Sequence, residues 1–178
     1  MNWRVLGAMV ILPCTGLVLI PAAILRWSRN TKLAADLAGC NQIELWAGIF
    51  VGDAGLILML WTVSLFAKVG RGTPAPWNPP KRLVVQGPYR HVRNPMITGV
   101  LLVLLAEALI FQSWPLACWM AIFLIGNALY FPLVEEKGLV ERFGGEYILY
   151  RNNVPRWIPQ RKPWHIPGQG ESERSQLE

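Results

Sequence analysis

Residues 95–136 read PMITGVLLVLLAEALIFQSWPLACWMAIFLIGNALYFPLVEE, and this stretch decides the fold. It holds two apolar segments, residues 95–112 and 114–135, with almost no polar sequence between them. A helix that spans the hydrocarbon core of a bilayer needs about 20 predominantly apolar residues. Pro95 suits a helix start, because the backbone donor that proline lacks has no partner there. The stretch therefore predicts an antiparallel hairpin of two membrane-spanning helices.

Two further apolar segments, residues 3–26 and 43–67, precede the hairpin. The chain is 53% hydrophobic and 16% charged, whereas soluble domains carry about 25% charged residues. We therefore predict an all-α integral membrane protein with about four transmembrane helices. Its expected parts are an N-terminal helix pair (residues 1–67), a core of basic loop, hairpin and C-terminal helix (68–162), and a polar tail (163–178).

The segment after the hairpin is predicted to be helical but not to span the membrane. Residues 135–151 have the mixed pattern of an amphipathic helix, and the polar residues after Pro167 are expected to be disordered. Tryptophans at the ends of the apolar segments suit the interfacial aromatic belt of a membrane protein. These tryptophans are Trp3, Trp27, Trp46 and Trp114, whereas Trp61 and Trp119 are interpreted as core residues.

Basic residues divide unequally between the two sides of the predicted membrane protein. Arg4, the loop of residues 68–94 and the tail after the hairpin carry 14 of the 17 Lys and Arg, and the first loop carries 3. Because cytoplasmic loops are enriched in Lys and Arg, both termini are expected in the cytoplasm. The position of these charges beside apolar segments favours a lipid bilayer as the partner and argues against nucleic acid.

The loop before the hairpin is the place where chemistry is expected. Residues 72–99 contain six prolines, which favour a rigid loop. A rigid, basic and aromatic loop suits an anionic or nucleotide-like ligand, although its charges can equally serve only to set the topology. No metal site is predicted, because the three cysteines and two histidines lack metal-ligand spacing.

Three motifs follow one another in a specific order: GPYRHVRNPMITG at residues 87–99, the pair Glu135-Glu136, and RFGGEYILYRNNVPRWIP at residues 142–159. Together they resemble the isoprenylcysteine carboxyl methyltransferase and phospholipid methyltransferase superfamily in its bacterial, integral membrane form. The resemblance implies methyl transfer from S-adenosylmethionine to a lipidic or amphiphilic small molecule, in the bacterial inner membrane. The lack of a strand followed by a GxGxxG motif agrees with a cofactor site outside the Rossmann fold.

The resemblance also implies roles for individual residues. The expected cofactor-binding residues are Lys81, Arg82, Leu83, Val84, Tyr89, Asn94, Pro95, Met96, Ile97, Glu135 and Glu136. The expected catalytic residues are Arg90, Arg93 and Asn94. Such residues suit S-adenosylmethionine, because an acid can pair with its ammonium and an Arg fork can bind its carboxylate.

The two acids are expected to differ in role, because neighbouring residues on a helix point about 100° apart. Glu135 is expected to face the cofactor's ammonium. Glu136 is expected to brace the loop through Arg90 or Arg93.

Three positions depart from the family pattern. The motif His is Asn94, the motif Tyr is Ile97, and Phe131 stands where the prenylcysteine enzymes resemble one another in carrying a substrate-binding Arg. The last departure argues against a prenylcysteine acceptor but not against methyl transfer. Two other functions stay open at this point: an NADPH-dependent reductase of the related sterol-reductase branch, and a non-catalytic membrane scaffold.

Three polar residues, Asp53, Glu107 and Asn127, lie inside the predicted spans. An ionisable residue within a span is a functional candidate, but hydrogen bonding between helices is the favoured interpretation for both acids. The expected partners are the bilayer and a lipophilic methyl acceptor. The sequence indicates no particular protein partner.

Overall fold

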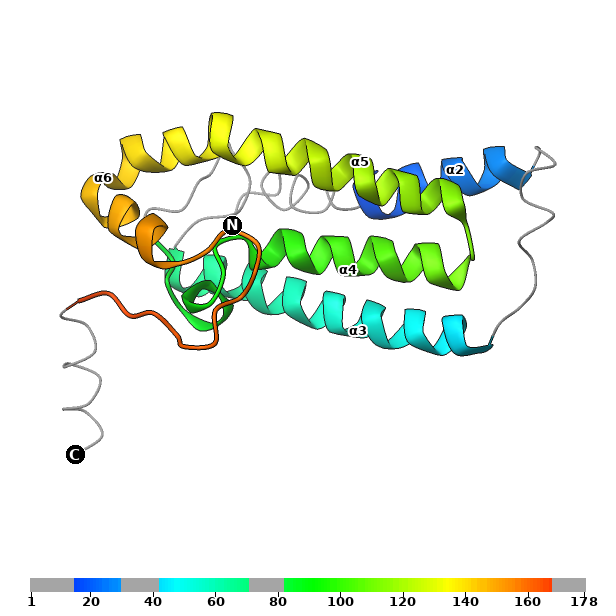
Figure 1. Cartoon of the computed structure of the whole chain (residues 1–178), viewed down its shortest axis with the longest axis horizontal. Coiled ribbons are helices and arrows are strands. Elements are labelled where there is room, and N and C mark those ends of the chain that lie inside the picture. Colours follow the sequence, from blue (N-terminus) through cyan, green and yellow to red (C-terminus); the bar gives the residue numbers. More distant parts are fainter. Residues whose placement is uncertain (1–14, 30–41, 71–81, 168–178) are drawn as a thin grey trace.

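The computed structural model describes residues 15–29, 42–70 and 82–167, and this part of the chain is helical with no strand (Figure 1). The all-α prediction is therefore confirmed for the described residues. In chain order the elements are the π-helical turn η1 (Thr15–Leu19), α2 (Ile20–Arg29), α3 (Gln42–Leu65) with its π-helical extension η3 (Phe66–Gly70), the 3-10 turn η4 (Gly87–Arg90), α4 (Pro95–Ile110), α5 (Trp114–Tyr130), the π-helical turn η5 (Phe131–Glu135) and α6 (Glu136–Asn153).

The predicted hairpin is present as α4 and α5. The chain turns between them over three residues, where Gln112 adopts a φ of 45°. Figure 1 shows α3, α4 and α5 along the long axis of the molecule, each antiparallel to the next. The end of α3, the start of α4 and the end of α5 therefore meet at one end of the bundle, which carries the candidate site.

Helices α3 and α4 pack backbone to backbone. A Cβ atom added to Gly55 would lie 2.8 Å from the carbonyl oxygen of Gly99, and one added to Gly99 would lie 2.9 Å from the carbonyl oxygen of Gly55. At the other end of the pair, a Cβ on Gly48 would lie 2.7 Å from Ile110. Small residues permit such close approach between membrane helices. The division of the chain after residue 67 stays a prediction, although α3 contacts the core helix α4 directly.

Two helices are long and apolar enough, by length and composition, to cross a membrane. They are the continuous helices Gln42–Gly70 and Trp114–Asn153. The apolar helix α4 has 16 residues and is about 24 Å long, which is shorter than a hydrocarbon core of about 30 Å. Part of the first predicted span lies outside the described residues. The number of spans therefore stays a prediction.

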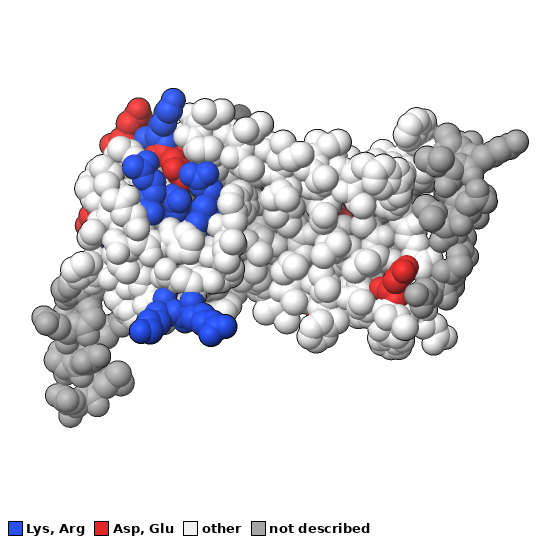
Figure 2. Space-filling model, viewed as in Figure 1, with Lys and Arg blue, Asp and Glu red and all other residues white. Residues whose placement is uncertain are grey.

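The surface of the helical body is mostly apolar. Figure 2 shows a mostly uncharged surface along the middle of the molecule, Lys and Arg gathered at the end where α6 lies, and acidic residues at both ends. Trp27, Trp46 and Trp114 are exposed near helix ends, Trp3 lies outside the described residues, and the aromatic belt stays a prediction. The core interpretation of Trp61 is wrong, since this side chain is 51% exposed and only part of its ring covers Gly87.

Helix α6 continues α5 through η5 and then turns across the end of the bundle (Figure 1). The turn occurs at Gly144, whose φ of 53° and ψ of −128° are rarely adopted by other residues. Beyond it, Tyr147 and Tyr150 form a small core with Val85 and Val154. The segment predicted as an amphipathic helix is thus helical with a sharp kink, and its second half covers the loop that leads into α4.

Candidate functional site

The loop that leads into α4 folds as a compact turn. Gly87 has a φ of 54°, and a Cβ there would lie 3.1 Å from the Trp61 ring, so both conformation and space favour glycine. Tyr89 is buried edge to face against Phe66, with 5.5 Å between the ring centroids. Burial, together with the nearby Tyr150, raises the pKa of the Tyr89 hydroxyl above its usual value, so the ring stays neutral. Tyr89 therefore anchors the loop, and its cofactor contact stays a prediction.

The segment that follows α6, residues 154–166, returns to this loop, and we call it the strap. The Arg93 N–H donates to the Pro155 carbonyl at 2.9 Å, and the Gln160 N–H donates to the His91 carbonyl at 3.0 Å. The His91 Nδ1 donates to the Gln160 carbonyl at 2.8 Å. The Arg90 carbonyl accepts from the Trp164 N–H and from Gln160 Nε2. These bonds join the loop to the strap.

Helix α6 adds one more bond to the same loop. The buried Tyr150 hydroxyl donates to the Tyr89 carbonyl at 2.7 Å. The Tyr150 ring also lies 5.8 Å from the ring of Trp164 on the strap, centroid to centroid. One tyrosine therefore connects helix, loop and strap.

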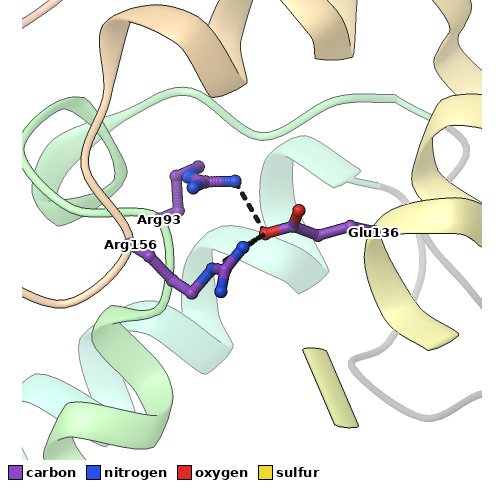
Figure 3. A network of polar contacts seen from close by, with 3 residues as sticks. All are labelled: Arg93, Glu136 and Arg156. Atoms are coloured by element: carbon purple, nitrogen blue, oxygen red, sulfur yellow. Dashed lines mark hydrogen bonds and ion pairs between the residues drawn. The ribbon is translucent and has the colours of Figure 1, made fainter. Parts of the chain in front are cut away.

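A buried charge network joins the same three segments. Glu136, at the start of α6, accepts from Arg93 Nη1 of the loop at 2.8 Å through its Oε1 atom. The same oxygen accepts from Arg156 of the strap, from Nη2 at 2.7 Å and Nε at 2.9 Å (Figure 3). The side chains of Arg93 and Glu136 are 11% and 10% exposed, and that of Arg156 is 27% exposed. Two guanidinium groups thus share one carboxylate oxygen, which leaves a surplus positive charge within this network of three residues.

Two buried donors beside this network have no hydrogen-bond partner among the described residues: Arg93 Nε and Asn94 Nδ2. Asn94 precedes α4, but its side chain does not cap the helix. An unsatisfied buried donor costs about 1–3 kcal/mol. Both donors belong to consecutive residues just before α4, so they are candidates for binding a ligand with acceptor oxygens, such as a carboxylate.

Glu135 differs from its neighbour. It is half-buried at the end of η5, and it makes no ion pair with another residue of the described ranges. Its carboxylate is therefore not engaged by the network that holds Glu136. The expected ion pair between Glu136 and a loop arginine is confirmed for Arg93 as a contact. The two functional roles stay predictions.

The remaining predicted residues lie along the loop and the first turn of α4. Arg82 is exposed, Leu83 is partly buried against the small core, and Val84 is buried. Pro95 is buried, and Met96 and Ile97 are half-buried. Arg90 donates from Nε to the Val85 carbonyl at 3.4 Å. Lys81 and the tail after residue 167 lie outside the described residues.

Sequence reasoning did not single out the residues that hold the loop in place. Arg156 lies inside the motif of residues 142–159, but nothing in the motif indicates that it contacts Glu136. Tyr150 and Gln160 gave no signal, because their partners are loop carbonyl groups that every residue possesses. Such contacts depend on the path of the backbone rather than on residue type.

The three polar residues within the predicted spans do not join the site. The Asn127 Nδ2 donates to the Phe123 carbonyl of its own helix at 2.8 Å. Asp53 is exposed on α3, and Glu107 carries a buried Oε2 with no partner in the described part of the chain. The hydrogen bonds between helices that were expected for Asp53 and Glu107 are not seen among the described residues.

A comparison with protein families matches residues 43–146 to the family described as phospholipid methyltransferase. The chain belongs to this family. A comparison with curated proteins gave no match. The family match covers α3, η4, the hairpin and the first half of α6. It includes Arg93, Asn94 and both glutamates, and it ends before Tyr150 and the strap.

Proposed function

We propose that this protein is an integral membrane methyltransferase that transfers a methyl group from S-adenosylmethionine to a lipidic or amphiphilic small molecule. Family membership supports the reaction class. The observation that carries the cofactor is the pair of buried donors without a hydrogen-bond partner among the described residues, Arg93 Nε and Asn94 Nδ2. Glu135, which makes no ion pair within the described ranges but interacts electrostatically with Arg142, is the proposed partner of the ammonium. Such donors together with a carboxylate suit a ligand that has both a carboxylate and an ammonium.

S-adenosylmethionine supplies a methyl group on a sulfonium, which a nucleophile can take without acid catalysis. The protein's contribution is then to bind, orient and exclude water. Arg93 and Asn94 would hold the carboxylate end, and Glu135 would hold the ammonium end. Leu83, Val84 and the first turn of α4 offer apolar and backbone groups beside them. Glu136 is excluded from direct binding through Oε1, because two arginines already occupy that oxygen.

The acceptor is proposed to enter from the bilayer. The apolar surfaces of α3 and α5 and the family both support a membrane location. We keep the four-span arrangement with both termini in the cytoplasm as part of this proposal. The acceptor class is isoprenylcysteine carboxylate-like or phospholipid-like, and Phe131 on η5 argues against a prenylcysteine.

Calorimetry on the full chain in detergent tests the proposal. S-adenosylhomocysteine, the demethylated product, should bind to the parent protein, and NADPH should not. Asn94→Ala should weaken binding about tenfold, because a hydrogen bond to a charged group contributes about 1.5–3 kcal/mol. Asn153→Ala, an exposed residue whose amide bonds only its own helix, is the matched control. Binding of NADPH alone would favour the reductase, and binding of neither compound would favour a scaffold.

A further inference from the structure

The strap lies beyond the part of the chain that the family match covers, yet it makes several hydrogen bonds to the loop. Residues 43–146 match the family, whereas Arg156, Gln160 and Trp164 follow them. We propose that Arg156 is a positioning residue, which acts through Glu136 to fix the loop that presents Arg93 and Asn94. The effect of Arg156 on cofactor binding rests on the proposed function. The effect of Arg156 on the order of the loop does not rest on it.

The geometry at Glu136 supports this role. Arg156 reaches Oε1 with two nitrogens, Nη2 at 2.7 Å and Nε at 2.9 Å, whereas Arg93 reaches it with Nη1 at 2.8 Å. Two donors from one planar guanidinium restrain the oxygen that accepts them more than a single donor would. Arg156 therefore fixes the position of Oε1, and Oε1 in turn holds Arg93 Nη1.

The backbone on either side strengthens the same connection. Pro155, next to Arg156, accepts from the Arg93 N–H at 2.9 Å. Arg93 is thus held at its main chain and at its side chain by two consecutive strap residues, the second through Glu136. Figure 3 shows Arg93 of the loop and Arg156 of the strap, both directed at Glu136. The Nε of Arg93 and the amide of Asn94 are then left for a ligand.

The surplus charge gives the network a second effect. Two guanidinium groups and one carboxylate leave one net positive charge in a mostly buried position. Neutralising Arg156 removes that surplus, and with it part of the attraction for an anionic group. A lysine at this position retains the charge but loses the two-point contact. Comparing lysine with glutamine at position 156 therefore separates orientation from charge.

Hydrogen–deuterium exchange on the full chain in detergent measures the positioning directly. Arg156→Gln and Arg156→Lys should each speed exchange of the His91, Val92 and Arg93 amides about tenfold, the scale of one hydrogen bond to a charged group. Amides of α3 and α4 should change less than about twofold, as expected for a local effect. Arg161→Gln, an exposed arginine of the same strap, is the matched control and should behave like the parent. Equal exchange in Arg156→Gln and Arg161→Gln would overturn the proposal, and so would a uniform increase over all helices.

Affinity for S-adenosylhomocysteine tests the link to function. Arg156→Gln should bind about tenfold more weakly than the parent, again on the scale of one such hydrogen bond, and Arg161→Gln should be unchanged. In a Glu136→Gln background, Arg156→Gln should lower this affinity by less than about twofold, because the effects of residues that act through one partner are not additive. Fully additive effects would show that Arg156 does not act through Glu136. If the parent itself does not bind the compound, the proposed function fails, and the exchange experiment still decides the positioning role.

Discussion

The helical body and the end of the bundle that carries the site are held together by different interactions. Along the helical body, α3 and α4 meet through glycines whose backbones leave no room for a side chain. At the site end, loop, α6 and strap meet through a buried carboxylate, two arginines and backbone hydrogen bonds. In lipid there is little hydrophobic drive between helices, so shape decides how they associate. Where polar segments meet, a buried charge orients its partners, but each charge depends on the others.

Glu136→Gln should have the largest effect, because it leaves two mostly buried guanidinium groups without a carboxylate. Removal of one partner from a buried charge network typically costs about 3–5 kcal/mol. Denaturation of the detergent-solubilised protein would measure the loss in free energy of unfolding. Glu141→Gln, an exposed acid on the same helix, should change it by less than about 0.5 kcal/mol. Equal losses for the two variants would mean that the network does not hold the site end together.

Glu135→Gln tests whether the neighbouring acid belongs to the ligand rather than to the fold. It makes no ion pair with a described residue, so the free energy of unfolding should stay within about 0.5 kcal/mol of the parent. Affinity for S-adenosylhomocysteine should fall on the order of a hundredfold, or about 2.7 kcal/mol. Calorimetry on this variant and on Glu136→Gln compares the two roles. Parent-like binding by Glu135→Gln would rule out the ammonium contact.

Gly55→Ala tests the packing of the helical body. The new Cβ would lie 2.8 Å from the Gly99 carbonyl oxygen, so the backbones must separate, at a cost of about 1–3 kcal/mol. Gly126→Ala is the matched control, since nothing lies within 4 Å of its Cβ position in α5. There the better helix propensity of alanine should raise stability by about 0.5–1 kcal/mol. Thermal unfolding of both variants should therefore show shifts of opposite sign. Shifts of the same sign would contradict backbone packing between α3 and α4.

Tyr150→Phe should have the smallest effect of the four. It removes the hydroxyl that donates to the Tyr89 carbonyl and keeps the ring between Tyr147 and Trp164. The free energy of unfolding should fall by about 1 kcal/mol, the usual contribution of one hydrogen bond. Tyr130→Phe, at a tyrosine that is 46% exposed, is the control in the same denaturation experiment. A loss as large as that of Glu136→Gln would show that hydrogen bonds, rather than charges, dominate the site end.

The helices of this protein could be predicted because their signals are local. The apolar stretch of residues 95–136 places a helix on each side of a short turn, and Pro95 marks the start of the first. The motif order around residues 87–99 and Glu135-Glu136 also indicated the family, which the family match confirms. The number of spans was not settled, since α4 is shorter than the hydrocarbon core. Trp61 was misjudged because residue type alone does not show which side of a helix is covered.

The sequence by itself determined that this chain forms apolar helices in a hairpin and carries the motifs of a methyltransferase family. Periodicity, apolar length and motif order are properties of neighbouring residues, so they need no knowledge of the path of the chain. Only the tertiary structure decided which member of the acidic pair is engaged. Glu136 accepts from Arg93, 43 residues before it, and from Arg156, 20 residues after it, whereas Glu135 beside it pairs with neither. That outcome depends on the 100° between adjacent helical side chains and on where the strap returns after the kink at Gly144.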